Sequence, residues 1–178
     1  MNPWHDIDAG RINADKFVAV TEIAKGSRQK YEIDKESGML MIDRILATSM
    51  RYPANYGFIP KTLSEDGDPL DVLIICSEEI APMTLAECVT VGVIEMIDGG
   101  ERDEKIIAVL KKDPYYGHIT EINQLPENAL REIDHFLRVY KGLEKDIDVA
   151  VHPVKGREEA MKIINEAKVL YAKTFAGK

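Results

Sequence analysis

Residues 66–71 constrain the fold and the function of this chain more than any other stretch. They read Asp-Gly-Asp-Pro-Leu-Asp, so three carboxylates fall within one short segment. Glycine favours turns and proline lacks the N–H that a helix requires, so we expect a tight turn here and not a helix. The apolar residues 72–75 follow directly and predict a buried strand. The three acids are therefore expected on a turn that leads into the core.

Two interpretations of this acidic turn remain open. Three close carboxylates repel one another, and a divalent cation that prefers hard oxygen ligands, such as Mg²⁺, Mn²⁺ or Ca²⁺, would offset the repulsion. A solvated surface turn explains the same residues, because aspartate and glycine are common in turns. A calcium loop of the EF-hand type is excluded, since it needs Gly at its sixth position and Glu at its twelfth, where this chain has Asp71 and Ser77.

The composition supports one globular domain over residues 1–178. Hydrophobic residues make up 45% of the chain and charged residues 30%, which is enough apolar material for a core. The formal net charge of −8 argues against a general nucleic-acid binder. We expect no membrane span and no secretory signal. Cys76 and Cys88 form no CxxC pair and are expected to be buried free thiols, as in a cytoplasmic protein.

Strand-like segments dominate the first two thirds of the chain and helical spacing the last third. We expect strands near residues 16–23, 30–34, 39–46, 72–75, 87–97, 106–110 and 147–154, and helices near 127–140 and 157–175. Many short strands followed by two helices predict an α+β fold, mainly β, with a small closed barrel and two principal flanking helices.

Three segments of the chain carry charged residues that need partners. Residues 30–34 alternate charged and apolar side chains, which places Lys30, Glu32 and Asp34 on one face. Residues 39–46 are apolar on both faces, so Arg44 there needs an anion, and Asp43 should point away from it. A second acidic segment, residues 98–105, is expected to be the long loop of a hairpin, and Gly92 before it should mark a bend or a bulge.

Taken together, these segments resemble the soluble inorganic pyrophosphatases of family I, the Mg²⁺-dependent prokaryotic type. The resemblance covers nearly the whole chain in order. It includes Glu22, residues 30–34, Asp43-Arg44, Asn55-Tyr56-Gly57, the hexapeptide, the spacing of Asp98, Asp103 and Lys105, and Tyr140-Lys141. Residues 66–71 match the family's signature turn, Asp-small-Asp-Pro-apolar-Asp. The resemblance implies a five-stranded barrel of the oligonucleotide-binding (OB) type. It also implies a homo-oligomer, and specifically a hexamer.

The resemblance implies hydrolysis of pyrophosphate to two phosphates, which recycles phosphate and pulls biosynthetic reactions forward. It implies several Mg²⁺ ions per site, with Mn²⁺ or other divalent ions as substitutes. Their ligands would be Glu22, Glu32, Asp66, Asp71, Asp98 and Asp103, and Asp68 would be the general base for the attacking water. The phosphates would be bound by Lys30, Arg44, Tyr56, Lys105, Tyr140 and Lys141, of which Arg44 and Tyr56 also count as catalytic. Arg44 would thus find its anion in the substrate.

Three other functions compete with this interpretation. A barrel that binds nucleotides or nucleic acid would present a basic groove with exposed aromatic residues. An acidic protein that only buffers metal ions would leave Lys30, Arg44, Lys105 and Lys141 unexplained. A hydrolase of larger phosphate esters would use the same residues. Turnover of pyrophosphate that depends on Mg²⁺ would separate these functions.

Overall fold

The computed structural model describes residues 1–144 and 149–176. Its strands are β1 (Lys16–Ile23), β2 (Gln29–Ile33), β3 (Leu40–Ile45), β4 (Asn55–Phe58), β5 (Asp71–Ile75), β6 (Leu85–Asp98), β7 (Glu101–Leu110), β8 (Val149–Val151) and β9 (Lys155–Gly156). The helices are α1 (Glu127–Val139) and α2 (Arg157–Thr174), with short 3₁₀ turns η1 (Ala9–Arg11) and η2 (Ile122–Gln124). The mainly β chain with two principal helices confirms the predicted class.

Five of the strands close into a ring. β1 pairs with β4, β4 with β5, β5 with β7 and β7 with β6, and β6 returns to β1. The β5–β7 pairing is parallel, and the other four are antiparallel. β8 and β9 add to β6. Closure leaves few exposed strand edges. Because each strand pairs with two neighbours, closure also fixes where the strand ends lie relative to one another.

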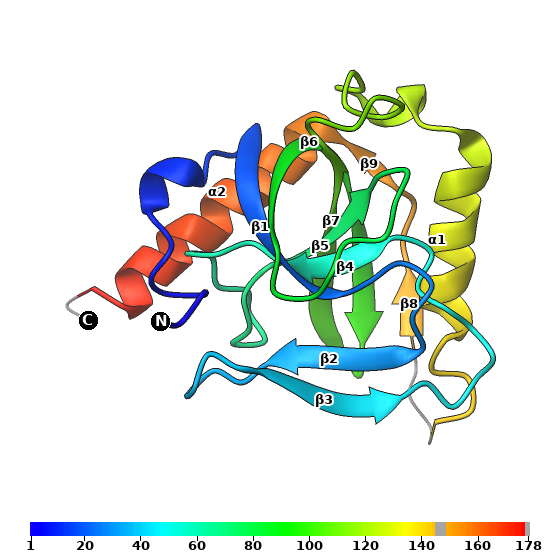
Figure 1. Ribbon diagram of the computed structural model, residues 1–178, viewed down its shortest axis with the longest axis horizontal. Helices are drawn as coiled ribbons and strands as arrows, with labels where there is room; N and C mark the ends of the chain where they lie inside the picture. Colours follow the sequence, from blue (N-terminus) through cyan, green and yellow to red (C-terminus); the bar gives the residue numbers. More distant parts are fainter. Residues whose placement is uncertain (145–148, 177–178) are drawn as a thin grey trace.

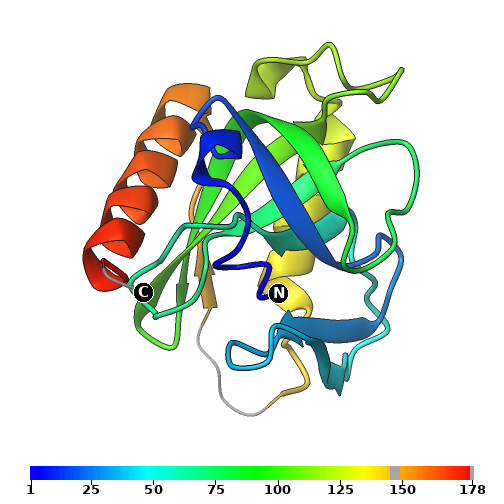
Figure 2. The ribbon, with the colours of Figure 1, turned by 60° about the vertical axis from the view of Figure 1, so that its left-hand side comes forward.

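Alternate residues of the ring strands pack into two apolar clusters. Val72 and Ile74 of β5 belong to a cluster with α2, whereas Leu73 and Ile75 belong to a cluster with α1. Because both faces of the strand are covered, its sequence is a continuous apolar run. Figure 1 shows α2 on the left and α1 on the right of the ring, and Figure 2 shows α2 along its side. In the described residues no helix is long and apolar enough to cross a membrane.

β2 and β3 form a separate two-stranded sheet, at the bottom of Figure 1. The strand expected at residues 39–46 is confirmed as β3, but its apolar residues are not buried as a run that is apolar on both faces would suggest. Met41, Ile42 and Ile45 expose 54%, 50% and 53% of their surface, and only Leu46, after the strand, is buried. Among the described residues, no third strand pairs with this sheet. An apolar run predicts that burial of its side chains is favourable. It does not show whether other residues of the same chain bury them.

The β6–β7 hairpin also differs from the prediction. Its turn is Gly99-Gly100, both with positive φ (58° and 88°), and pairing resumes at once between Asp98 and Glu101. Two glycines suit a tight hairpin turn. Asp103 and Lys105 therefore lie on a strand and not in a long loop. The bend or bulge expected at Gly92 is confirmed as a register shift in the pairing between Thr90 and Gly92.

The C-terminal part matches the prediction in outline. The final strand was expected over residues 147–154, but the strand that the structure describes covers only Val149–Val151. Residues 147–148 lie outside the described residues. The closing helix α2 matches the predicted range to within one residue. Both cysteines are buried and free, as expected.

Candidate active site

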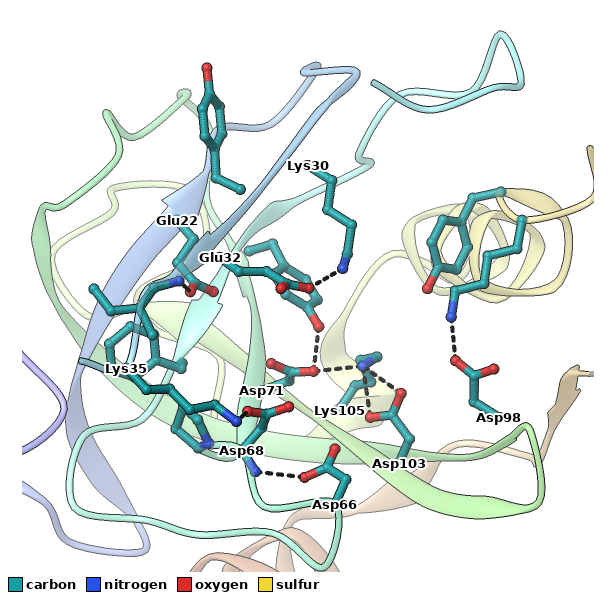
Figure 3. Close-up of a pocket in the computed structure, with 17 residues that line it drawn as sticks. Glu22, Lys30, Glu32, Lys35, Asp66, Asp68, Asp71, Asp98, Asp103 and Lys105 are labelled. Carbon is teal, nitrogen blue, oxygen red and sulfur yellow. Dashed lines mark hydrogen bonds and ion pairs between the residues drawn. The ribbon is translucent and has the colours of Figure 1, made fainter. Parts of the chain in front are cut away.

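A pocket of about 320 Å³ lies where the β2–β3 sheet meets the strand ends of the ring and the end of α1. Figure 3 shows the side chains that line it. All site residues predicted from the sequence line this pocket except Arg44: Glu22, Lys30, Glu32, Tyr56, Asp66, Asp68, Asp71, Asp98, Asp103, Lys105, Tyr140 and Lys141. Residues that are far apart in the sequence are thus brought together, and Lys35 lies among them although the sequence analysis did not predict it.

The acidic turn has the predicted form. The backbone N–H of Asp68 donates to Asp66 Oδ1 at 2.9 Å, and Gly67 has φ of +84°, a conformation that glycine adopts without strain. Asp71 is the first residue of β5 and lies opposite Lys105 in the parallel β5–β7 pairing. The ring topology therefore sets Lys105 beside the last aspartate of the turn.

Lys105 is the centre of the pocket. Its Nζ donates to Asp71 Oδ2 at 2.6 Å and to the two oxygens of Asp103 at 2.8 and 2.9 Å, as Figure 3 shows. Only 5% of its side chain is exposed. Burial alone would lower the pKa of Lys105, but the charge of Asp71 and its other neighbours raises it well above the usual value. Lys105 is therefore a fixed cation between two carboxylates.

Tyr56 supports the same aspartate. Its hydroxyl donates to Asp71 Oδ2, and its ring lies 5.5 Å from Lys105 Nζ. Burial, and then the charge of Asp71, raise the pKa of the Tyr56 hydroxyl well above its usual value, so the group stays protonated and donates. Burial also raises the pKa of Asp71, partly offset by Lys105. Tyr52 packs behind Tyr56, with ring centroids 5.5 Å apart.

The other lysines of the pocket also pair with acids. Lys30 pairs with Glu32 and Lys141 with Asp98. Burial lowers the pKa of Lys30, but the hydrogen bond and the charge of Glu32 outweigh this and raise it. Lys35 pairs with Asp68. Each ammonium group therefore already holds a carboxylate in this form of the site.

Glu22 is the exception, because no lysine or arginine in the described residues forms an ion pair with it. The residue is 5% exposed, and its carboxylate accepts the backbone N–H of Ile33 at 2.7 Å. Burial, followed by the negative charge of Asp71, raises the pKa of Glu22 to about 8. The charge of Lys30 lowers the pKa of Glu22 only slightly, so this buried carboxylate is left without an ion-pair partner among the described residues.

Arg44 differs from the prediction, since it does not line the pocket. Its Nη1 lies 3.2 Å from Glu144 Oε2, and its Nε lies 3.5 Å from Asp43 Oδ2. The expectation that Asp43 points away from Arg44 was wrong. Opposite the Lys30–Tyr31 step, the pairing skips Asp43, so β3 contains a bulge there. A bulge turns a side chain away from the regular alternation, and this turns Asp43 toward Arg44 and Lys30.

The donor set of this pocket fits divalent cations. Carboxylate oxygens are the hard ligands that Mg²⁺ prefers, and the buried Glu22 forms no ion pair with a described lysine or arginine. In residues 1–144 and 149–176, no group of three or more His, Cys, Asp or Glu side chains is arranged to hold a metal ion. The lysines account for this arrangement, because Lys105 separates Asp71 from Asp103 and the others hold Glu32, Asp68 and Asp98 individually.

Carboxylates and ammonium groups around one pocket are typical of proteins that bind divalent cations together with phosphate groups. A family model described as inorganic pyrophosphatase matches residues 19–172. The chain belongs to the inorganic pyrophosphatase family.

Individual relatives agree with this assignment. Soluble inorganic pyrophosphatase 2 of Chlamydomonas reinhardtii is 46% identical over 175 residues, which are 98% of this chain and 90% of the relative. The solved inorganic pyrophosphatase of Helicobacter pylori is 41% identical with a TM-score of 0.86, covering 90% of this chain and 95% of that one. The Thermus thermophilus structure has a TM-score of 0.91 at 35% identity, covering 96% and 99%.

Proposed function

We propose that this protein hydrolyses inorganic pyrophosphate to two phosphate ions, and that residues 1–178 form one catalytic domain. The observation that carries the proposal is the single pocket that combines the acidic turn with lysines from other elements. Membership of the inorganic pyrophosphatase family supports it. In a cell the reaction would recycle phosphate and pull forward the biosynthetic reactions that release pyrophosphate.

The charge of the pocket supports a requirement for divalent cations. Seven carboxylates line the pocket against four ammonium groups, a formal excess of three negative charges. Even with Glu22 protonated, at its pKa of about 8, two negative charges remain in excess at neutral pH. A polyanion such as pyrophosphate is repelled by such a pocket. We therefore propose several Mg²⁺ ions per site, for which Mn²⁺ or other divalent ions substitute.

We propose the roles that the family resemblance implies. Glu22, Glu32, Asp66, Asp71, Asp98 and Asp103 would hold the cations, and bound cations would lower the pKa of water and offset charge on the phosphoryl oxygens. Asp68 lies on the exposed acidic turn and would take the proton of the attacking water. Lys30, Tyr56, Lys105, Tyr140 and Lys141 would bind phosphoryl oxygens. Arg44 lies opposite Lys30, which lines the pocket, and would reach the substrate after leaving Glu144.

Three finer features belong to the same proposal. The ring of five strands supports a barrel of the OB type. The exposed apolar residues of β3 support self-association, and we propose a homo-oligomer, specifically a hexamer. The buried free cysteines support a reducing compartment such as the cytoplasm. The acidic net charge supports neither nucleic acid nor a membrane surface as a partner.

The first experiment measures phosphate release from pyrophosphate with Mg²⁺ and with EDTA. We expect rapid release with Mg²⁺ and none with EDTA. Asp68→Asn should keep the fold and bind Mg²⁺ but lose at least about 100-fold in rate, because the general base is removed. Glu87→Gln is the matched carboxyl-to-amide control, because Glu87 is half-exposed and does not line the pocket.

Two results would contradict the proposal. A folded protein that binds Mg²⁺ but releases no phosphate would be a binding module. Faster hydrolysis of nucleotides or other phosphate esters than of pyrophosphate, measured in parallel, would make the protein a hydrolase of larger substrates. If Asp68→Asn hydrolyses pyrophosphate as fast as the unmodified protein across the pH range, Asp68 is not the general base. The proposed hydrolysis itself would stand.

A further inference from the structure

Lys35 reaches the proposed base from another part of the chain. It lies in the turn between β2 and β3 and was not among the site residues predicted from the sequence. Its Nζ forms an ion pair with Asp68 Oδ1 and donates to the backbone carbonyl of Gly67 at 3.3 Å. In Figure 3 the Lys35 side chain extends along the pocket with its ammonium group on Asp68. One side chain thus contacts both the carboxylate and the backbone at the tip of the acidic turn.

Other elements of the fold give the tip of this turn little further support. Within the loop, Gly67 N–H donates to Ser64 O at 3.1 Å, Ser64 N–H donates to Asp68 O at 2.7 Å and Asp68 N–H donates to Asp66. A Cβ built on Gly67 would meet nothing within 4 Å, so the tip does not pack against another element. Among the hydrogen bonds and ion pairs of residues 1–144 and 149–176, those that reach residues 66–68 from outside the loop come from Lys35.

The backbone of Lys35 is itself held in place. Asn2 Nδ2 donates to the Lys35 carbonyl at 2.9 Å, and Gly38 N–H closes the turn on Asp34 O at 2.8 Å. A Cβ on Gly38 would lie 2.9 Å from Asn2 Cα, so the turn fits closely against the N-terminal arm. The arm fixes the β2–β3 turn, and this turn carries the lysine that reaches Asp68.

We propose that Lys35 is a positioning residue for the proposed hydrolysis. It holds the carboxylate of Asp68 in the orientation that accepts the proton of water, and it does not bind phosphate. The inference rests on the proposed function. The Lys35 and Asp68 side chains are 51% and 50% exposed, and an exposed ion pair contributes little to stability. A change in rate without a change in stability would therefore report orientation.

The test compares steady-state kinetics of Lys35 variants with those of the unmodified protein. Lys35→Ala should lower kcat by about fivefold to tenfold and change KM by less than about twofold, because a misplaced catalytic group affects the chemical step. Lys35→Arg should restore most of kcat, since a guanidinium pairs with the same carboxylate. Lys111→Ala is the matched control: Lys111 also pairs with one carboxylate and is 47% exposed, outside the pocket.

A double-mutant cycle separates positioning from a general structural role. In an Asp68→Asn background, Lys35→Ala should cause no further loss of kcat, because both changes act through one carboxylate. An equal loss in both backgrounds would overturn the inference. An unchanged kcat would also overturn it, and so would a raised KM with kcat intact, which is the behaviour of a phosphate ligand. If the unmodified protein itself turns over no pyrophosphate, the proposed function fails, and the inference fails with it.

Discussion

Lys105→Met removes the cation at the centre of the pocket and keeps most of the volume of the side chain. The Lys105 ammonium group makes one contact with Asp71 and two with Asp103, all between 2.6 and 2.9 Å. Methionine replaces the apolar stem but pairs with neither acid. The variant therefore leaves two neighbouring carboxylates without their shared cation, and the metal-free protein should lose stability at neutral pH.

The size of the loss follows from the burial of the partners. Breaking a fully buried ion pair by removing one partner costs about 3–5 kcal/mol. Asp71 and Asp103 keep 27% and 19% of their side chains exposed, so water screens part of this penalty. We expect the free energy of unfolding to fall by about 2–3 kcal/mol. At acidic pH the loss should shrink, because protonation of Asp71, whose pKa is already raised, relieves the repulsion.

Urea unfolding at one protein concentration, with EDTA and with Mg²⁺, measures both parts of this prediction. A ligand at 100 times its dissociation constant stabilises a protein by about 2.7 kcal/mol. If Asp71 and Asp103 bind metal ions, Mg²⁺ should stabilise Lys105→Met more than it stabilises the unmodified protein, because the competing ammonium group is gone. Equal stabilisation of both proteins would refute the metal assignment. An unchanged stability in EDTA would refute the role of Lys105 as counter-ion.

Two further predictions concern single carboxylates. Asp71→Asn should raise the Mg²⁺ concentration that gives half-maximal activity by about tenfold or more, since one of the proposed metal ligands is lost; an unaltered Mg²⁺ titration would count against the assignment. Asp113 accepts hydrogen bonds from Ser77, Tyr115 and Tyr116, which outweigh the effect of burial and lower its pKa below 3.8. The stabilisation from these hydrogen bonds is present above pH 3.8 and is lost as the pH falls through the lowered pKa. Asp113→Asn should therefore lower the free energy of unfolding by about 2 kcal/mol at pH 7 and by little in strong acid, as measured by urea unfolding.

Much of the site was predictable because several of its residues belong to short local patterns. The turn at residues 66–71 needs only glycine and proline chemistry, and the strand after it needs only an apolar run. The alternation at residues 30–34 correctly placed Lys30 and Glu32 together, since they pair with each other and both line the pocket. Asp34, predicted on the same face, follows the end of β2 and accepts hydrogen bonds from Ser37 in the turn. These inferences depend on neighbours in the sequence, and the structure agrees with them.

The features that were missed depend on pairing between distant segments. The bulge at Asp43 arises from the register of β2 against β3, which periodicity cannot determine. Lys35 lies in a turn whose side chain meets Asp68 only after the hairpin has folded against the N-terminal arm. The exposure of Met41 and Ile42 could not be predicted either. An apolar run is compatible both with a strand in the core and with a strand whose apolar side chains lie on the surface.

The lysines of the pocket explain how a dense group of acids is compatible with a folded protein before any cation binds. Lys105, Lys141 and Lys30 hold Asp71, Asp98 and Glu32, and each of these lysines is also proposed to bind phosphate. Under the proposed function, folding and substrate binding would use the same ammonium groups with different anions. Pyrophosphate alone would have to compete with carboxylates that are already in place and that repel it. Divalent ions would replace the lysines at the carboxylates, so the acidic turn and the lysines would act as one site only with divalent ions bound.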